Sequence, residues 1–138
     1  MNEILVVGSV AFDDIVTPFG KVTNSLGGSA TYFSVSASHF CKVKLVAVVG
    51  DDFTDKHHKI FHKHNVDITG LEKTAGKTFK WVGKYEQDIN RAITIRTDLN
   101  VFEKFSPKIP ESYKKIPYVF LANIDPDLQW DVLTQMDK

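Results

Sequence analysis

The chain has 138 residues, of which 43% are hydrophobic and 25% charged, and these proportions are ordinary for one globular domain with a hydrophobic core. Seventeen basic and seventeen acidic side chains cancel, which disfavours nucleic acid as a partner because proteins that bind polyanions generally carry a basic excess. The single cysteine excludes an internal disulfide framework. No stretch has the pattern of a signal peptide or a membrane span, so we expect a cytoplasmic protein without a membrane partner.

Three short segments are continuously apolar, as strands covered on both faces of a parallel sheet generally are. They comprise residues 4–7, 44–49 and 118–122. Apolar residues recur at helical spacing over residues 29–40, 55–64 and 127–136. Strands and helices thus alternate, which predicts an α/β fold: a three-layer α/β/α sandwich around a mostly parallel sheet. Three parallel strands are few for such a sheet, so we expect the fold to be incomplete at its C-terminal end.

Local signals refine the first two helices. Ser29 is expected to cap the first helix, and Phe40 is expected on its buried face. The second helix is expected to bury Ile60, with Asp51 and Asp52 capping its start.

Residues 78–97 have a different pattern. Polar and apolar side chains alternate over residues 79–85 and 92–97, as in strands with one solvated face, and residues 87–90 form a hairpin connection. Antiparallel strands between parallel ones predict a small separate sheet beside the main layer. Aromatic residues alternate with lysines in the first of these strands, and we interpret them as a cover over a pocket or a subunit contact, not as a platform for nucleic acid.

Two glycine motifs that hold nucleotide phosphates are absent. Gly8 ends the first strand, but no Gly-x-Gly-x-x-Gly follows it, and no Gly-x-x-x-x-Gly-Lys-Ser occurs. A dehydrogenase or a P-loop enzyme is therefore disfavoured. His58 and His62 are four residues apart and could share a metal ion, but lysines surround them, so we interpret them as a solvated helix face and expect no metal site.

Polar residues follow two of the predicted parallel strands. Asp13 and Asp14 come after the first strand, at the carboxyl edge where open α/β sheets bind ligands. A carboxylate there can accept hydrogen bonds from two sugar hydroxyls, but aspartate is also common in turns. Asn123 and Asp125 follow the third strand at the same edge. They could line the same pocket, or Asp125 could simply begin the next helix.

Gly27 and Gly28 precede the first helix. Paired glycines let the backbone approach a ligand and act as a hinge, and the N–H groups of a helix start can face polar ligand oxygens. The alternative is a tight turn that leads into the helix.

Taken in order, these features resemble the N-terminal half of the ribokinase-like (PfkB) carbohydrate and nucleoside kinases, which transfer a phosphoryl group from ATP to an alcohol. The resemblance rests on the first strand with its aspartate, the Gly-Gly pair before a helix, and the second strand ending in Gly50-Asp51-Asp52. It covers nearly the whole chain and implies lid strands around residues 15–26 and 78–97. It also implies that Asp13 grips the substrate while Asp14 faces solvent. The substrate-binding residues that it implies are Asp13, Gly27, Gly28, Tyr32, Asn123 and Asp125.

The same resemblance places the chemistry elsewhere. In the family, an aspartate within Gly-Ala-Gly-Asp deprotonates the acceptor hydroxyl, and magnesium neutralises the phosphates of ATP. That motif does not occur in residues 1–138, so the catalytic aspartate and the sites for ATP and Mg²⁺ are expected beyond residue 138. The chain alone is expected to be inactive.

The resemblance also bears on the identity of the acceptor. Ala11 and Tyr32 stand where many members that act on furanoses carry asparagine, which leaves a sugar, a nucleoside or another alcohol as candidates. Tyr32 offers an aromatic face for stacking. A homodimer through the lid would cover exposed strand edges. The alternative function is a non-catalytic small-molecule-binding or interaction domain derived from the same fold.

Overall fold

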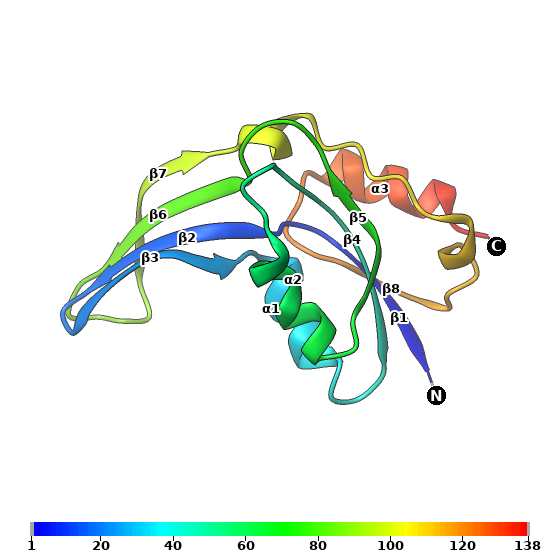
Figure 1. Ribbon diagram of the computed structural model, residues 1–138, viewed down its shortest axis with the longest axis horizontal. Coiled ribbons are helices and arrows are strands. Elements are labelled where there is room, and N and C mark those ends of the chain that lie inside the picture. The colour runs from blue at the N-terminus through cyan, green and yellow to red at the C-terminus, as the bar shows by residue number, and fades with distance from the viewer. Residues whose placement is uncertain (1, 138) are drawn as a thin grey trace.

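The computed structural model describes residues 2–137 and contains two four-stranded sheets (Figure 1). The main sheet has the strand order β5-β4-β1-β8, and all neighbours in it are parallel. Its strands are β1 (Glu3–Val7), β4 (Lys42–Val49), β5 (Asp67–Lys73) and β8 (Tyr118–Leu121). Because parallel strands are joined by crossovers, their carboxyl ends lie along one edge of the sheet.

Helices cover both faces of the main sheet, as the burial of three successive residues at the end of β1 requires. Val6 packs on one face with α1 (Ser29–Ala37) and α2 (Asp55–Lys63). Leu5 and Val7 point to the other face, toward the core beneath α3 (Pro126–Gln135) and the 3₁₀ helices η1 (Asn100–Lys104) and η2 (Glu111–Tyr113). Figure 1 shows α1 and α2 on one side of the sheet and α3 on the other. The predicted three-layer α/β/α sandwich is therefore confirmed.

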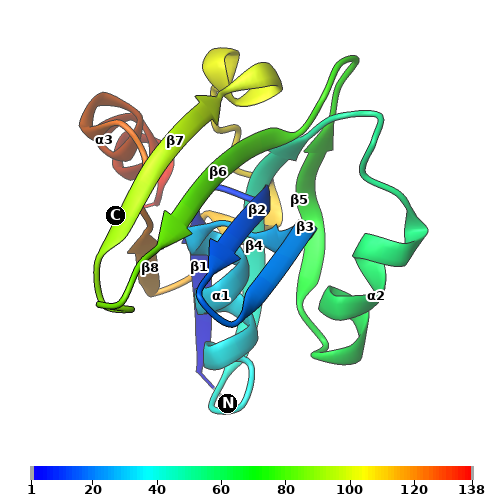
Figure 2. The same ribbon diagram turned by 90° about the vertical axis from the view of Figure 1, so that its left-hand side faces the viewer.

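The second sheet, which we call the small sheet, extends from the carboxyl edge of the main sheet (Figures 1 and 2). Its strands are β2 (Ala11–Thr17), β3 (Gly20–Gly27), β6 (Phe79–Tyr85) and β7 (Ala92–Asp98). The order is β3-β2-β6-β7, so two antiparallel hairpins meet along a parallel β2–β6 seam. The hairpin predicted from the alternating pattern of residues 79–85 and 92–97 is thus confirmed as the β6–β7 pair.

Two strands of the main sheet differ from the sequence expectation. β8 is only partly buried, with Tyr118 56% exposed, because within residues 2–137 it pairs on one side only. β5 was not predicted, because its sequence mixes charged residues with Gly70 and shows no apolar run. Gly70 lies so close to the carbonyl oxygen of Leu45 that a Cβ atom would approach it to 2.7 Å, which explains a glycine inside a strand.

The helix ends and buried faces also require corrections. Gly28 occupies the N-cap of α1 in place of Ser29, and Phe40 is 85% exposed because the helix ends at Ala37 and the chain turns into β4. Thr54 occupies the N-cap of α2, where its N–H donates to Nδ1 of His57 at 3.0 Å. Ile60 lies at the border of the buried face, 37% exposed.

Candidate functional site

Three segments meet at the carboxyl edge of the main sheet, and Ser29 joins them. Its hydroxyl lies 3.1 Å from the Ser9 hydroxyl, directly after β1, and accepts a hydrogen bond from the Asn123 N–H, directly after β8, at 3.2 Å. The Ser29 N–H donates to the Ser9 hydroxyl at 3.1 Å. The start of α1 is thereby fixed against the ends of two parallel strands. From the sequence we expected Ser29 only to cap the helix, so its hydrogen bonds to the segments that follow β1 and β8 were not predicted.

Gly28 has a conformation that a side chain would oppose. Its φ of 93° lies in the left-handed region, and a Cβ atom there would overlap the carbonyl oxygen of Ser9. That carbonyl also accepts a hydrogen bond from the Ala30 N–H at 3.0 Å. The glycine therefore allows the backbone to turn closely over Ser9 before α1 begins.

Gly27 lies against the side chain of Asp13. The two residues are on the paired strands β3 and β2, and a Cβ atom on Gly27 would overlap the Asp13 carboxylate. Asp13 is half-buried, and among residues 2–137 its carboxylate has no hydrogen-bond or ion-pair partner. Burial, followed by the neighbouring charge of Asp14, raises the pKa of Asp13. An unsatisfied carboxylate in a partly desolvated position has acceptor capacity available for a ligand.

Asp14 has the opposite environment, and the expectation that it faces solvent is wrong. Its carboxylate accepts the Asn24 N–H at 2.7 Å and pairs with the Lys80 ammonium at 3.0 Å. The backbone hydrogen bond from Asn24, followed by the hydrogen bond from Lys80, lowers the pKa of Asp14. Because successive side chains of a strand point to opposite faces, two adjacent aspartates have separate roles. Asp14 ties β2 to β3 and β6, while Asp13 remains unpaired.

Tyr32 lies on α1 near Asp13 and is 62% exposed. Partial burial raises the pKa of its hydroxyl, and the nearby charges of Asp13 and Tyr85 act in the same direction. Tyr85 ends strand β6. Tyr32 therefore stands where the helix, the first hairpin and the second hairpin approach one another.

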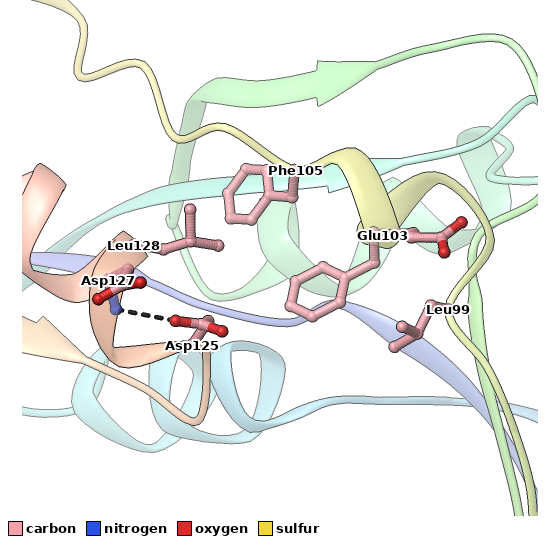
Figure 3. Close-up of a pocket in the computed structure, with 7 residues that line it drawn as sticks. Leu99, Glu103, Phe105, Asp125, Asp127 and Leu128 are labelled. Atoms are coloured by element: carbon pink, nitrogen blue, oxygen red, sulfur yellow. Dashed lines mark hydrogen bonds between the residues drawn. The ribbon is translucent and has the colours of Figure 1, made fainter.

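Asn123 and Asp125 reach the same edge through the loop after β8. Asn123 contributes its backbone N–H to Ser29, as described above. Asp125 is the N-cap of α3 and accepts the Asp127 N–H at 2.8 Å. It also lines a cavity of about 500 Å³ between η1 and the start of α3 (Figure 3). Asp125 thus begins the helix, and the cavity that it lines does not include Asp13, Gly27, Gly28 or Tyr32.

A second junction connects the main sheet to β6, and sequence analysis missed it. The Asp52 carboxylate accepts the N–H of Thr78 at 2.8 Å and its hydroxyl at 2.6 Å. The Asp51 carboxylate accepts the Gly76 N–H at 3.0 Å. These aspartates were expected to cap α2, but they hold the loop that leads into β6. Nothing in the sequence near Thr78 marks it as their partner.

The described residues show neither a metal centre nor a membrane span. Within residues 2–137 no three histidine, cysteine or acidic side chains are arranged to hold a metal ion. His58 and His62 have ring centroids 6.4 Å apart on α2. None of the helices in this part of the chain is long and apolar enough to cross a membrane.

Comparison with known proteins supports this description of the fold. The nucleoside kinase of Methanocaldococcus jannaschii, an archaeal member of the ribokinase family, superposes with a TM-score of 0.74 at 20% identity, covering 98% of this chain and 49% of that protein. Ribokinase from Cryptococcus neoformans var. grubii, solved with ADP, superposes with a TM-score of 0.75 at 17% identity, covering 98% and 47%. The chain therefore has the fold of the ribokinase-like (PfkB) kinases, and the resemblance predicted from the sequence is confirmed.

The chain is also similar in sequence to a curated kinase. Over 138 residues the chain is 27% identical to a cytidine kinase from Thermococcus kodakarensis, covering 99% of this chain and 49% of that protein. No family model matches the chain. The chain spans about half the length of the relatives it matches.

Proposed function

We propose that the chain is the acceptor-binding half of a ribokinase-like kinase that transfers a phosphoryl group from ATP to a hydroxyl of a sugar or nucleoside. The catalytic aspartate and the sites for ATP and Mg²⁺ would lie beyond residue 138. Two kinds of relative support this proposal, since a cytidine kinase and a nucleoside kinase both align along nearly the whole chain. The setting would be cytoplasmic.

The observation that carries the proposal is the unpaired Asp13 carboxylate beside Gly27. A half-buried carboxylate without a protein partner is stabilised when a ligand supplies hydrogen-bond donors. Two vicinal hydroxyls of a sugar ring are suitable donors, because a carboxylate can accept from both. The absence of a side chain at Gly27 leaves room for the Asp13 carboxylate itself to take this position.

The remaining predicted site residues would surround this contact. Gly28, which carries no side chain, would let the acceptor approach the backbone at the start of α1. Tyr32 would offer its exposed ring to a base or a sugar face. Asn123 and Asp125 would close the site from the β8 side. The acceptor hydroxyl would then point toward the part of the protein that follows residue 138.

The small sheet would act as a lid over the acceptor. Its closure would exclude water, so that ATP phosphorylates the acceptor instead of being hydrolysed. Large apolar side chains on this sheet are partly exposed: Val16, Val22, Ile93 and Ile95. Pairing of two lids would cover them and would give a homodimer. A monomer in sedimentation of the complete protein would contradict the dimer but not the kinase.

Acceptor binding can be measured directly on the 138-residue chain. Calorimetric titration with ribose, cytidine and adenosine should give binding that Asp13→Ala abolishes. Glu72→Gln is a matched control, because Glu72 is exposed on the opposite edge strand of the main sheet. Binding of an acceptor that survives Asp13→Ala would refute the assignment of Asp13.

A non-catalytic small-molecule-binding domain derived from the same fold is the second candidate, because the unpaired Asp13 carboxylate could hold a ligand without any chemistry. Such a domain would bind the same ligands through Asp13 but would never consume ATP. Purification of the protein from its source, followed by an assay for phosphorylated product, separates the two. Product formation supports the kinase, whereas binding without product supports the binding domain.

A further inference from the structure

The cavity beside Asp125 has walls suited to a flat aromatic ring. It measures about 500 Å³ and lies between η1 and the start of α3 (Figure 3). Its lining residues are Leu99, Phe102, Glu103, Phe105, Asp125, Asp127 and Leu128. The size falls in the range of small-molecule sites, which are generally apolar with a few fixed polar groups.

Stacked phenylalanines connect this cavity to the small sheet. The rings of Phe102 and Phe105 have centroids 5.6 Å apart at an interplanar angle of 25°. Phe79, the first residue of β6, stacks on Phe102 at 5.2 Å and 12°. These rings form an apolar wall, and a planar ligand packed against it would gain apolar burial.

Asp125 supplies a hydrogen-bond acceptor whose position is fixed. One of its carboxylate oxygens accepts the Asp127 N–H at 2.8 Å, which holds the side chain in place. The other oxygen has no hydrogen-bond partner among residues 2–137, and Figure 3 shows it turned toward the side of the cavity formed by Leu99 and Glu103. Acceptors fixed in this way select ligands that carry a donor at the matching position.

The charges at the cavity restrict the ligand further. Glu103 and Asp127 add two carboxylates to that of Asp125, and no cation pairs with any of them in the described part of the chain. Three neighbouring negative charges oppose a phosphate or a carboxylate ligand. They favour amino groups, since aspartate and glutamate accept hydrogen bonds from the exocyclic amine of cytosine.

We propose that this cavity binds the amino-substituted base of the acceptor nucleoside and that Asp125 selects it. The base would stack beside Phe102 and Phe105, and its exocyclic amine would donate to the free oxygen of Asp125. The bond between Asn123 and Ser29 brings this loop to the start of α1, beside the proposed ribose site at Asp13. The inference rests on the proposed function, because it requires that the acceptor be a nucleoside.

The test exploits a difference of one group between paired nucleosides. Cytidine and adenosine carry an exocyclic amine where uridine and inosine carry a carbonyl oxygen. Calorimetric titration of the 138-residue chain should show cytidine and adenosine binding about tenfold more tightly than uridine and inosine, as one hydrogen bond to a charged group predicts. Asp125→Asn keeps an oxygen for the Asp127 N–H but replaces the free oxygen with an NH₂ donor. This variant should therefore reverse the preference toward uridine and inosine.

Glu72→Gln is again the control and should leave the preference unchanged. Circular dichroism of Asp125→Asn checks that α3 is retained, which we expect because asparagine is a good N-cap. Equal binding of all four nucleosides, or a preference that Asp125→Asn does not alter, would overturn the base site while leaving the proposed acceptor function intact. Binding of ribose alone, with no gain from any base, would also overturn it. Failure of ribose and of every nucleoside to bind would contradict the proposed function itself.

Discussion

The Thr78 hydroxyl donates to the Asp52 carboxylate at 2.6 Å and accepts the Gly50 N–H at 3.0 Å. Thr78 is only 1% exposed, so this contact is shielded from water. It joins the end of β4 in the main sheet to the residue that precedes β6 in the small sheet. The second hairpin therefore starts from a fixed point.

We predict that Thr78→Val lowers the free energy of unfolding by about 1–3 kcal/mol. Valine keeps the shape of threonine but leaves the buried Gly50 N–H without its partner and removes one of the two hydrogen bonds to the Asp52 carboxylate. Urea denaturation followed by circular dichroism measures the change. The matched control is Thr23→Val, because Thr23 is exposed on β3. An equal effect of both substitutions would show that the hydrogen bonds of Thr78 contribute nothing specific.

The contact between Gly27 and Asp13 predicts a non-additive pair. Gly27→Ala should destabilise the chain by about 1–3 kcal/mol, because the added methyl group overlaps the Asp13 carboxylate. In the Asp13→Ala background the same change should cost much less, since the overlapping oxygens are gone. A double-mutant cycle in urea measures the coupling. Additive effects would mean that the backbone at Gly27, and not the carboxylate, resists the methyl group.

Asp13→Asn should separate stability from binding. The folded pKa of Asp13 is raised by burial and by Asp14, so its ionisation opposes folding as the pH rises above the ordinary value of 3.8. The amide should therefore raise the melting temperature at pH 7, and this gain should vanish below pH 3.8. The same variant should lose acceptor affinity. A lower melting temperature at neutral pH would contradict this account of the Asp13 environment.

Acceptor affinity of the unmodified chain should depend on pH in a matching way. Ionised Asp13 accepts hydrogen bonds from two hydroxyls more strongly than the protonated acid, one of whose oxygens carries a donor proton. Because its pKa is raised, affinity should begin to fall at a pH above the ordinary range of aspartate as the solution is acidified. Calorimetric titration from pH 7 to pH 4 measures this. Constant affinity over that range would argue against a carboxylate contact.

Asp14 gives a prediction of opposite sign. The Asn24 N–H and the Lys80 ammonium lower its folded pKa below 3.8, so the stability it contributes is present above that value and is lost as the pH falls through the folded pKa. Asp14→Asn should therefore destabilise the chain at pH 7 and have progressively less effect as the solution is acidified below pH 3.8. Thermal melts across this range test it, and a deficit that persists at low pH would exclude the ion pair as its cause.

The sequence alone predicted those parts of the fold whose residues respond mainly to local forces. Apolar runs located β1 and β4, and alternation located β6 and β7, because burial on two faces or one leaves a direct pattern. β5 was not predicted because it is an edge strand whose position depends on pairing with β4. Pairing of that kind is a property of the folded chain and leaves little local signal.

The candidate site was predictable only in part, for a similar reason. Gly28 was visible because an unusual backbone conformation demands glycine at that position. The partners of Asp52 and Ser29 are 26 and 94 residues away, so their roles depend on contacts that no local pattern encodes. From local sequence alone, both residues were therefore predicted to cap the helices that follow them.

The parallel seam between β2 and β6 has a consequence for how the protein acquires its site. Each hairpin of the small sheet closes locally, but Asp14 and Lys80 meet across the seam, and the residues between them include all of β4 and β5. Pairing over such a sequence separation is slow, because chain entropy is lost before the contact forms. We expect the β4–β5 and β1–β4 pairs to become protected from hydrogen exchange before the seam, because they join residues closer in sequence, and the β1–β8 pair after it. The newly made chain would then spend a period with a partly folded core and an unformed acceptor site, during which its two hairpins present open edges to chaperones or to one another.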